Sequence, residues 1–131
     1  MGAAPVRAIL DTGVLLATGV RPLEGELAIS VASLAELHFG VLVTADDAIR
    51  AERLKRLSVF QSTFDALPID IAVATSYGQL AAAVARSGRQ PRSRVMDLLI
   101  AATAHAHSAR LYTRNADDLV GIEHLVEIVA V

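Results

Sequence analysis

The sequence predicts an α/β fold, a three-layer α/β/α sandwich with a central sheet of five parallel strands. Short apolar runs alternate along the chain with longer helical segments, the order that right-handed crossovers between parallel strands produce. The composition is 53% hydrophobic and 20% charged, as expected when helices bury both faces of a sheet. The 131 residues suffice for one domain and are too few for two, so residues 1–131 are predicted to form a single domain.

The five predicted strands are apolar runs bounded by turn-forming or helix-starting residues. The first run ends directly at Asp11, and Pro68 stands near the end of the third. The runs are Val6–Leu10, Leu27–Ser30, Phe64–Ile69, Arg110–Thr113 and Leu125–Val129.

The segments between these runs predict helices. Ser33 and Glu36 have the spacing of a capping box, so a helix is predicted to open there. Asp70 is the expected N-cap of a later helix that is rich in small residues. Gly19 and Pro22 are expected to stop the first helix. The predicted helices are Thr12–Thr18, Ser33–Val43, Asp46–Phe60, Asp70–Ala85 and Val95–Ala109.

The composition also excludes several functional classes. Cysteine is absent, which removes disulfides, thiolate metal sites and a cysteine nucleophile. The aromatic fraction is 4%, which disfavours a binding surface of stacked rings. The longest apolar stretch, Leu98–Ala104, is far too short to span a bilayer, and no targeting signal is visible. We therefore expect a cytoplasmic protein with no membrane partner.

Four acidic residues stand where a predicted strand ends or a predicted helix begins: Asp11, Glu36, Asp97 and Asp118. Ligands of parallel α/β sheets bind beyond the carboxyl ends of the strands, and Asp11 and Asp118 follow two such ends. A crossover helix runs antiparallel to the strand that it feeds. The helix starts carrying Glu36 and Asp97 therefore face the same edge, where we expect one carboxylate cluster.

Such a cluster predicts a divalent metal ion. Carboxylates held close together repel one another, and a bound cation removes that penalty. Oxygen ligands without His or Cys favour Mg²⁺ or Mn²⁺ over zinc. A metal held in this way activates water and neutralises charge developing on phosphorus, which is suited to hydrolysis of a phosphodiester.

Each acid also has a purely structural explanation. Asp11 suits the N-cap between a strand and a helix, and Glu36 fills the last place of a capping box. Asp97 near a helix start gains from the helix dipole. Asp117 and Asp118 would serve equally well as solvated turn residues. The functional interpretation depends on all four acids facing one predicted edge.

Basic and polar residues beside the acids predict a surface that contacts RNA. Arginine binds phosphate through its planar fork of donors, although a solvated loop would explain a cluster of charges as well. Thr113 and Asn115 end the fourth strand and could hold a water or a phosphate oxygen, or simply cap the turn. The arginines close in sequence to two of the acids are Arg86, Arg89, Arg92, Arg94 and Arg114. Of these, Arg92, Arg94 and Arg114 are the candidate substrate ligands.

At these residues the sequence resembles the PIN-domain ribonucleases. The resemblance rests on Asp11 after "AIL", "SVASLAEL" carrying Glu36, "MDLLIAATA" opening with Asp97, and "YTRNADDLVGI" with Asn115 and Asp118. The segments follow one another in the family's order over nearly the whole chain, and the last two are the most specific. Within the family, the chain is most similar to the VapC toxins of bacterial type II toxin–antitoxin pairs.

This resemblance implies a PIN-like five-stranded parallel sheet and an endoribonuclease that depends on Mg²⁺ or Mn²⁺. It also implies a homodimer and neutralisation by a VapB-type antitoxin. Carried over by position, Asp11 and Asp97 would be the main metal ligands. Glu36 would be a ligand or position water, and Asp118, or else Asp117, would complete the acidic set.

Two positions depart from the family pattern. Gly13 stands where the family often has Asn or Ser, which is expected to loosen the turn at the metal site. Leu119 stands where Phe is usual, which is expected to be a tolerable change in the core.

Three alternatives remain to be weighed. Asp11-Thr12-Gly13 resembles the active-site triplet of retroviral-type aspartic proteases, but those chains are mostly β and carry a Gly-rich flap. A haloacid-dehalogenase phosphatase needs a second Asp where Gly13 stands. A catalytically inactive PIN-fold module that only binds a partner is the third alternative, and the intact acidic set argues against it.

Overall fold

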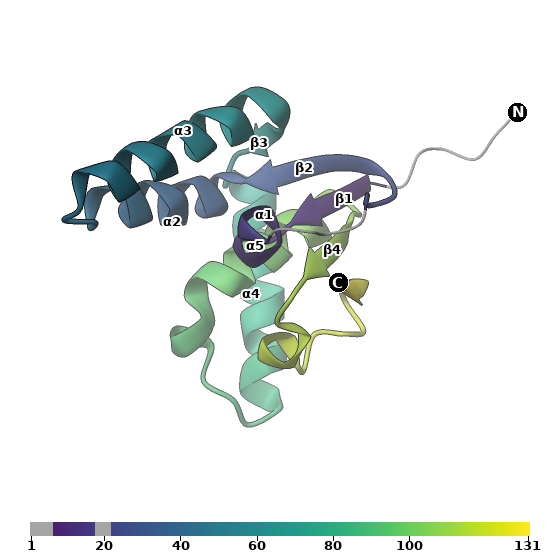
Figure 1. Cartoon of the computed structure of the whole chain (residues 1–131). Coiled ribbons are helices and arrows are strands. Elements are labelled where there is room, and N and C mark those ends of the chain that lie inside the picture. Colours follow the sequence, from purple (N-terminus) through teal and green to yellow (C-terminus); the bar gives the residue numbers. More distant parts are fainter. Residues whose placement is uncertain (1–6, 18–21) are drawn as a thin grey trace, which may run out of the picture.

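A five-stranded parallel sheet forms the centre of the protein, seen here in a computed structural model that describes residues 7–17 and 22–131 (Figure 1). Its strand order is β3-β2-β1-β4-β5. The strands are β1 Arg7–Leu10, β2 Glu26–Ser30, β3 Asp65–Leu67, β4 Arg110–Thr113 and β5 Ile128–Ala130. Every neighbouring pair is parallel, so the predicted sheet is confirmed.

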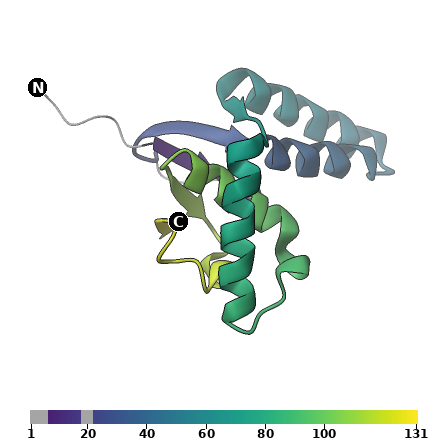
Figure 2. The same cartoon turned by 180° about the vertical axis from the view of Figure 1, so that it is seen from behind.

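Helices cover both faces of this sheet, which confirms the three-layer α/β/α class (Figures 1 and 2). In Figure 2, α4 runs in front of α5 on the face turned away from the view of Figure 1. The helices are α1 Thr12–Leu16, α2 Val31–Leu42, α3 Asp47–Thr63, α4 Ile71–Arg86 and α5 Val95–Ala106. Two short 3-10 helices, η1 Pro91–Arg94 and η2 Ala116–Leu119, precede α5 and follow β4.

Two apolar cores lie on the two faces of the sheet, as the alternation of side chains along a strand requires. Ile9 of β1 packs with residues of α4 and α5 in one core. Its neighbours Ala8 and Leu10 pack with residues of α1, α2 and α3 in the other. All three are buried, so β1 is buried on both faces, as the apolar composition predicts.

The start of α2 corrects the predicted capping box. The helix begins at Val31, and its N-cap is Ser30, whose Oγ accepts a hydrogen bond from the Ala32 N–H at 3.1 Å. Ser33 is fully buried inside the helix, and Glu36 lies in the second turn. The capping-box interpretation was wrong because Ser30 offers the same chemistry three residues earlier, directly where β2 ends.

Several other predicted ends move by a few residues. The described part of the first strand begins at Arg7, so Val6, like Thr18 and Gly19 at the end of the first predicted helix, lies outside the described residues. Helix α5 stops at Ala106 instead of Ala109, because Ser108 adopts a left-handed conformation with φ 52°. The predicted N-cap at Asp70 is confirmed by its 3.0 Å bond from the Val73 N–H.

The last strand also starts later than predicted, at Ile128 instead of Leu125. The residues before it belong to a turn that buries Ile122 and Val126 in the core formed with α4 and α5. Their apolar character reflects burial in that turn, and apolar sequence alone does not distinguish a buried turn from a strand.

The helices α2 and α3 form a pair that projects from one side of the sheet (Figure 1). They pack against each other, and Leu37 and Val41 of α2 share a core with Leu57 of α3. Among residues 7–17 and 22–131, no helix is both long and apolar enough to cross a membrane.

Candidate active site at the carboxyl edge of the sheet

The sheet reverses its strand order between β1 and β4, and this switch point positions the candidate site. From β1 the chain builds β2 and β3 on one side, then returns to build β4 and β5 on the other. Connections leave the two central strands in opposite directions, which opens a crevice beyond their carboxyl ends. Asp11 follows β1 directly at this crevice, and Thr113 is the last residue of β4.

Asp11 is held by contacts from both sides of the crevice. Its Oδ1 accepts the Val14 N–H at 2.9 Å, so the structural explanation as the N-cap of α1 is correct. Its Oδ2 accepts a hydrogen bond from the Thr113 hydroxyl. The Thr113 oxygen in turn accepts the Asn115 N–H at 3.0 Å. These contacts leave lone pairs on the Asp11 carboxylate for a further ligand, because each carboxylate oxygen can accept twice.

Of the two roles that the sequence leaves open for Thr113, the geometry favours the structural one. Thr113 is only 1% exposed, and its hydroxyl is used by Asp11 and Asn115. These two bonds make Thr113 a residue that positions Asp11 and the turn after β4.

Asp97 lies in the first turn of α5 and faces the same crevice. Asp11 and Asp97 line one small cavity of about 10 Å³, close to the space that a single water needs. Burial and the negative charges of Glu36 and Asp118 raise the pKa of Asp97 above its usual range. Arg94 lowers that pKa, and Asp11 adds a smaller upward contribution. The charges of Glu36, Asp118 and Asp11 all act on Asp97, so the four acids lie near one another at the predicted edge of the sheet.

Glu36 is tied to the site by a residue that the sequence interpretation missed. The Thr12 hydroxyl donates to Glu36 Oε1 at 2.6 Å and lies 3.1 Å from Ser33 Oγ. Thr12 belongs to α1 and the other two to α2, so this contact joins the two helices beside Asp11. Thr12 follows Asp11 in the chain, but no sequence pattern indicates a partner 24 residues away.

Asp118 is paired with an arginine of the segment before α5. Arg94 Nη2 lies 3.1 Å from Asp118 Oδ1, and both side chains are about one-third exposed, at 39% and 35%. Asp117 is exposed, and its carbonyl oxygen accepts Arg89 Nη1 at 3.1 Å. Of the two adjacent acids, Asp118 is the one whose charge acts on Asp97.

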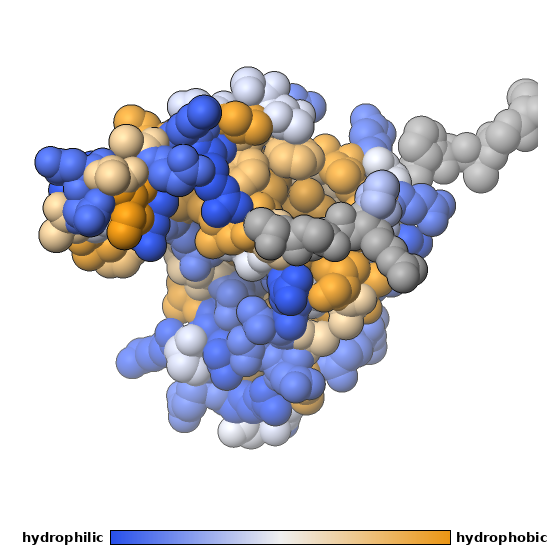
Figure 3. Space-filling view, viewed as in Figure 1, coloured by the Kyte–Doolittle hydropathy of each residue, from blue (hydrophilic) through white to orange (hydrophobic). Residues whose placement is uncertain are grey.

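The remaining predicted RNA ligands lie on the surface of this edge. Arg92, Arg114 and Asn115 are exposed, whereas Arg94 is partly buried by its ion pair. Figure 3 shows that the lower part of this view, over η1, the start of α5 and η2, is mainly hydrophilic. Exposed guanidinium groups around a crevice of carboxylates would contact the backbone of a nucleic acid without neutralising the acids.

The donor set fits an Mg²⁺ or Mn²⁺ ion. All its charged members are carboxylates, which these hard cations prefer. Within the described ranges, no three His, Asp or Glu side chains are already arranged to hold one ion together. Mg²⁺ commonly takes only one or two carboxylates and keeps several waters. Asp11 and Asp97 line one cavity and supply these two carboxylates. The other two acids already have partners, since Glu36 accepts a hydrogen bond from Thr12 and Asp118 is paired with Arg94.

The two departures from the family pattern have small structural consequences. A Cβ added at Gly13 would lie 3.5 Å from Asp11 Oδ1, an ordinary contact, and the cap of α1 forms without it. Leu119 is 3% exposed and belongs to the core with α4 and α5.

The raised pKa of Asp97, caused first by burial and then by the neighbouring negative charges, predicts an effect on stability in metal-free buffer. Because its folded pKa is raised, the folded protein binds the Asp97 proton more tightly than the unfolded chain, and deprotonation destabilises the fold. Asp97→Asn is therefore expected to melt at a higher temperature than the parent at neutral pH in EDTA. Each 1 kcal/mol added to the free energy of unfolding would raise the melting temperature by roughly 4 °C for a domain of this size.

The sign of the pH dependence can be checked by repeating the melts in acid. The advantage of Asp97→Asn should be full above the folded pKa of Asp97. It should shrink as the pH falls through that value and vanish below about 3.9, the pKa of an unperturbed Asp. A parent protein that melts at the same temperature as the variant at neutral pH would contradict a raised pKa at Asp97.

Comparison with known proteins identifies relatives of the whole chain. A sequence model of the PIN domain family matches residues 8–123. The chain is 37% identical to ribonuclease VapC5 of Mycobacterium tuberculosis (strain ATCC 25618 / H37Rv) over 139 positions, covering 100% of both chains. It is 34% identical to ribonuclease VapC8 of the same species over 100 residues, which cover 73% of this chain and 88% of VapC8.

Solved structures agree with the sequence comparison. The crystal structure of VapBC-5 from Mycobacterium tuberculosis, a member of the VapBC family of toxin–antitoxin systems, matches with a TM-score of 0.82 and 33% identity. The match covers 97% of this chain and 98% of that one. VapBC2 from Rickettsia felis shares the fold, with a TM-score of 0.78 at 24% identity over 96% and 99% of the two chains. The resemblance to VapC-type PIN-domain ribonucleases is confirmed, and the chain belongs to the PIN domain family.

Proposed function

We propose that this protein is an Mg²⁺- or Mn²⁺-dependent endoribonuclease of the VapC type, the toxin of a toxin–antitoxin pair. The observation that carries the proposal is the convergence of Asp11 and Asp97 on one cavity, with Glu36 and Asp118 close enough to raise the pKa of Asp97. Two relatives that are 37% and 34% identical to this chain are named ribonucleases, which supports the same reaction.

Each acidic residue has a part in this proposal. Asp11 and Asp97 hold the metal ion, and Thr113 fixes the Asp11 carboxylate for that purpose. The bound ion would make water more acidic and neutralise charge on the phosphate. Glu36, which Thr12 orients, would accept a hydrogen bond from water at the edge of the site. Asp118 completes the acidic set and keeps Arg94 beside it.

The RNA backbone would lie across the basic rim. Arg92, Arg114 and Asn115 are exposed there and can donate hydrogen bonds to phosphate oxygens. Arg94 can do so with those of its five N–H donors that the Asp118 pair does not use. Because the net charge is −2, local charge on this rim has to provide the attraction.

The neighbouring structures suggest the protein partner. VapBC-5 is a member of the VapBC family of toxin–antitoxin systems, and the structures from Rickettsia felis and Salmonella typhimurium are likewise VapBC structures. We propose a VapB-type antitoxin as the cognate partner of this chain, together with a homodimeric state and a cytoplasmic location.

Induced expression in a bacterial host tests the proposed function. The parent protein is expected to arrest growth, because uncontrolled cleavage of RNA stops protein synthesis. Asp11→Ala is expected to relieve the arrest, since it removes a metal ligand, and coexpression of the cognate antitoxin should relieve it as well. Western blotting of each strain confirms equal amounts of protein.

The same experiment addresses the inactive-module alternative. An inactive PIN-fold module that acts only by binding would remain as toxic after Asp11→Ala, provided that the variant folds, and that result would contradict the nuclease proposal. The aspartic-protease alternative is not favoured, because the described chain has a parallel sheet covered by helices instead of a mostly β fold.

A further inference from the structure

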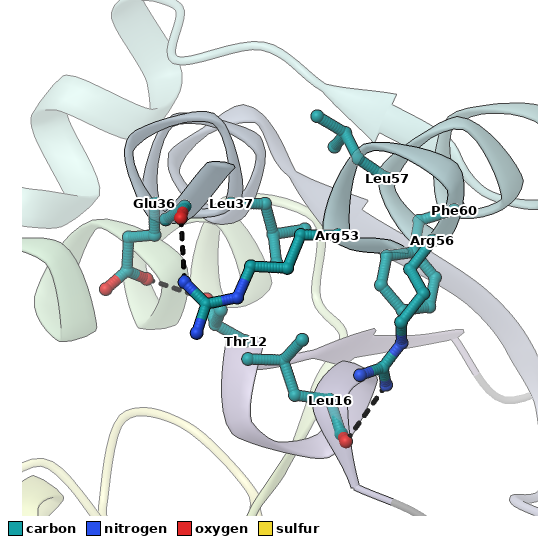
Figure 4. Close-up of a pocket in the computed structure, with 9 residues that line it drawn as sticks. Thr12, Leu16, Glu36, Leu37, Arg53, Arg56, Leu57 and Phe60 are labelled. Atoms are coloured by element: carbon teal, nitrogen blue, oxygen red, sulfur yellow. Dashed lines mark hydrogen bonds between the residues drawn. The ribbon is translucent and has the colours of Figure 1, made fainter. Parts of the chain in front are cut away.

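A second cavity lies beside the candidate active site, between α1 and the projecting pair of α2 and α3 (Figure 4). Its volume is about 330 Å³, at the small end of the range for small-molecule pockets. Leu16, Leu57 and Phe60 make an apolar wall, and Leu16 is 44% exposed. Such a half-open apolar hollow is suited to a flat, uncharged group that enters from solvent.

The cavity adjoins the acidic edge. Thr12 and Glu36, which are bonded to each other at 2.6 Å, both line it. Thr12 follows Asp11 in the chain, and the charge of Glu36 acts on Asp97. A nucleotide whose phosphate lies at Asp11 and Asp97 therefore has this hollow as its neighbour.

Two arginines of α3 frame the opening with oriented donors. Arg53 Nη1 donates to the Gly40 carbonyl at 2.8 Å and to Thr44 Oγ1 at 2.6 Å. These bonds fix the guanidinium and leave the donors on Nε and Nη2 for a ligand. Arg56 Nη2 donates to the Leu16 carbonyl at 3.1 Å, and its guanidinium carbon lies 5.9 Å from the centre of the Phe60 ring. Guanidinium planes that are held in place stack well on nucleobases.

We propose that this cavity binds one unpaired nucleobase of the RNA substrate, next to the phosphodiester that is cleaved, and so determines which sequence is cut. The proposal rests on the proposed ribonuclease function and deepens it. The cavity wall combines leucines with one carboxylate, Glu36, and two arginines, a mixed lining that suits an uncharged ring with polar edges. A nucleobase presents a flat face to the leucines and ring acceptors to Arg53, and its attached phosphate stays outside at the rim.

Gly40 offers a way to fill the cavity without removing a contact. It lines the hollow, and a Cβ built there meets no heavy atom of the described residues within 4 Å. Gly40→Leu should therefore place a side chain in the open space. Gly78→Leu is the matched control, because Gly78 is also helical and unobstructed among the described residues but belongs to α4. Leucine favours helix over glycine at both positions, so both variants are expected to fold.

Binding is measured without catalysis, in EDTA. The four nucleoside 5′-monophosphates are titrated while the methyl resonances of Leu16 and Leu57 are followed by NMR. At least one nucleotide is expected to shift them in the parent and in Gly78→Leu, and its Kd should rise about tenfold or more in Gly40→Leu. A tenfold loss matches one base-stacking contact. If no nucleotide shifts these resonances, or Gly40→Leu binds as tightly as the parent, the assignment is overturned.

Cleavage of a single-stranded RNA of randomised sequence supplies the second measurement. The parent and Gly78→Leu are expected to prefer one base at a fixed position beside the cut, and Gly40→Leu should lose that preference. A parent that binds nucleotides but cuts no RNA would refute the nuclease proposal while supporting the base site. If Gly40→Leu weakens binding of the antitoxin and nucleotides do not bind, the cavity receives a protein segment, and the base assignment is wrong.

Discussion

Asp97→Asn is expected to reduce the rate of RNA cleavage by about 1000-fold or more, the largest effect of a single substitution in this protein. The amide keeps the size of the side chain and its place in the first turn of α5 but removes the negative charge. Loss of one of two metal carboxylates should cost about 4 kcal/mol of transition-state stabilisation, which corresponds to that factor. Cleavage of a labelled RNA at fixed enzyme and Mg²⁺ concentrations measures it.

The control for this substitution is an acid of the same type at a distance from the site. Asp47 lies in the first turn of α3, and its side chain is 96% exposed, so Asp47→Asn should leave cleavage unchanged. The expected gain in melting temperature shows that Asp97→Asn is folded, which separates lost chemistry from lost structure. An Asp97→Asn protein that cleaves within a few-fold of the parent rate would remove Asp97 from the proposed metal site.

Chelation is expected to have an effect of comparable size. Treatment with EDTA should abolish cleavage, because the acidic edge then has carboxylates and no cation, and Mg²⁺ or Mn²⁺ added in excess should restore it. The ion should also raise the melting temperature of the parent, since it binds the folded state and relieves the repulsion at Asp97. Differential scanning calorimetry with increasing Mg²⁺ measures this second effect independently of RNA.

The same titration separates metal binding at the site from general effects of salt. Asp11→Asn removes one of the two proposed ligands, so its melting temperature should respond much less to Mg²⁺ than that of the parent. Buffers of equal ionic strength that contain NaCl and no divalent ion serve as the reference. Cleavage that continues in excess EDTA would show that the reaction needs no divalent ion.

The sequence was sufficient to place the acids at one edge, because that placement depends only on the order of strands and helices. Asp11 follows β1, and Asp97 lies in the first turn of the helix that leads into β4, so the parallel sheet itself brings them together. Glu36 was predicted at the correct edge of the sheet, but it lies in the second turn of its helix instead of the first. Its helix begins at Val31 with Ser30 as the N-cap, instead of opening at Ser33, and the two serines offer the same hydroxyl chemistry to a helix start.

The partners of these acids could not be predicted. Thr113 donates a hydrogen bond to Asp11, which lies 102 residues away in the sequence, and Arg94 forms an ion pair with Asp118. Such contacts depend on side-chain conformations and on distances of a few ångströms in the folded protein. Neither of these produces a periodic pattern or a characteristic residue spacing in the sequence. The second cavity was missed for the same reason, since its wall combines short stretches of α1, α2 and α3.

The bond between Thr113 and Asp11 also has a consequence for biosynthesis. Asp11 leaves the ribosome well before its partner, because Thr113 of the strand that orients its carboxylate is made 102 residues later. A nascent chain shorter than β4 lacks both the neighbouring strand and the hydroxyl, and such long-range pairings form late in folding. The site is thus incomplete until β4 has been made, so the proposed ribonuclease activity cannot begin on a nascent chain that still lacks this strand.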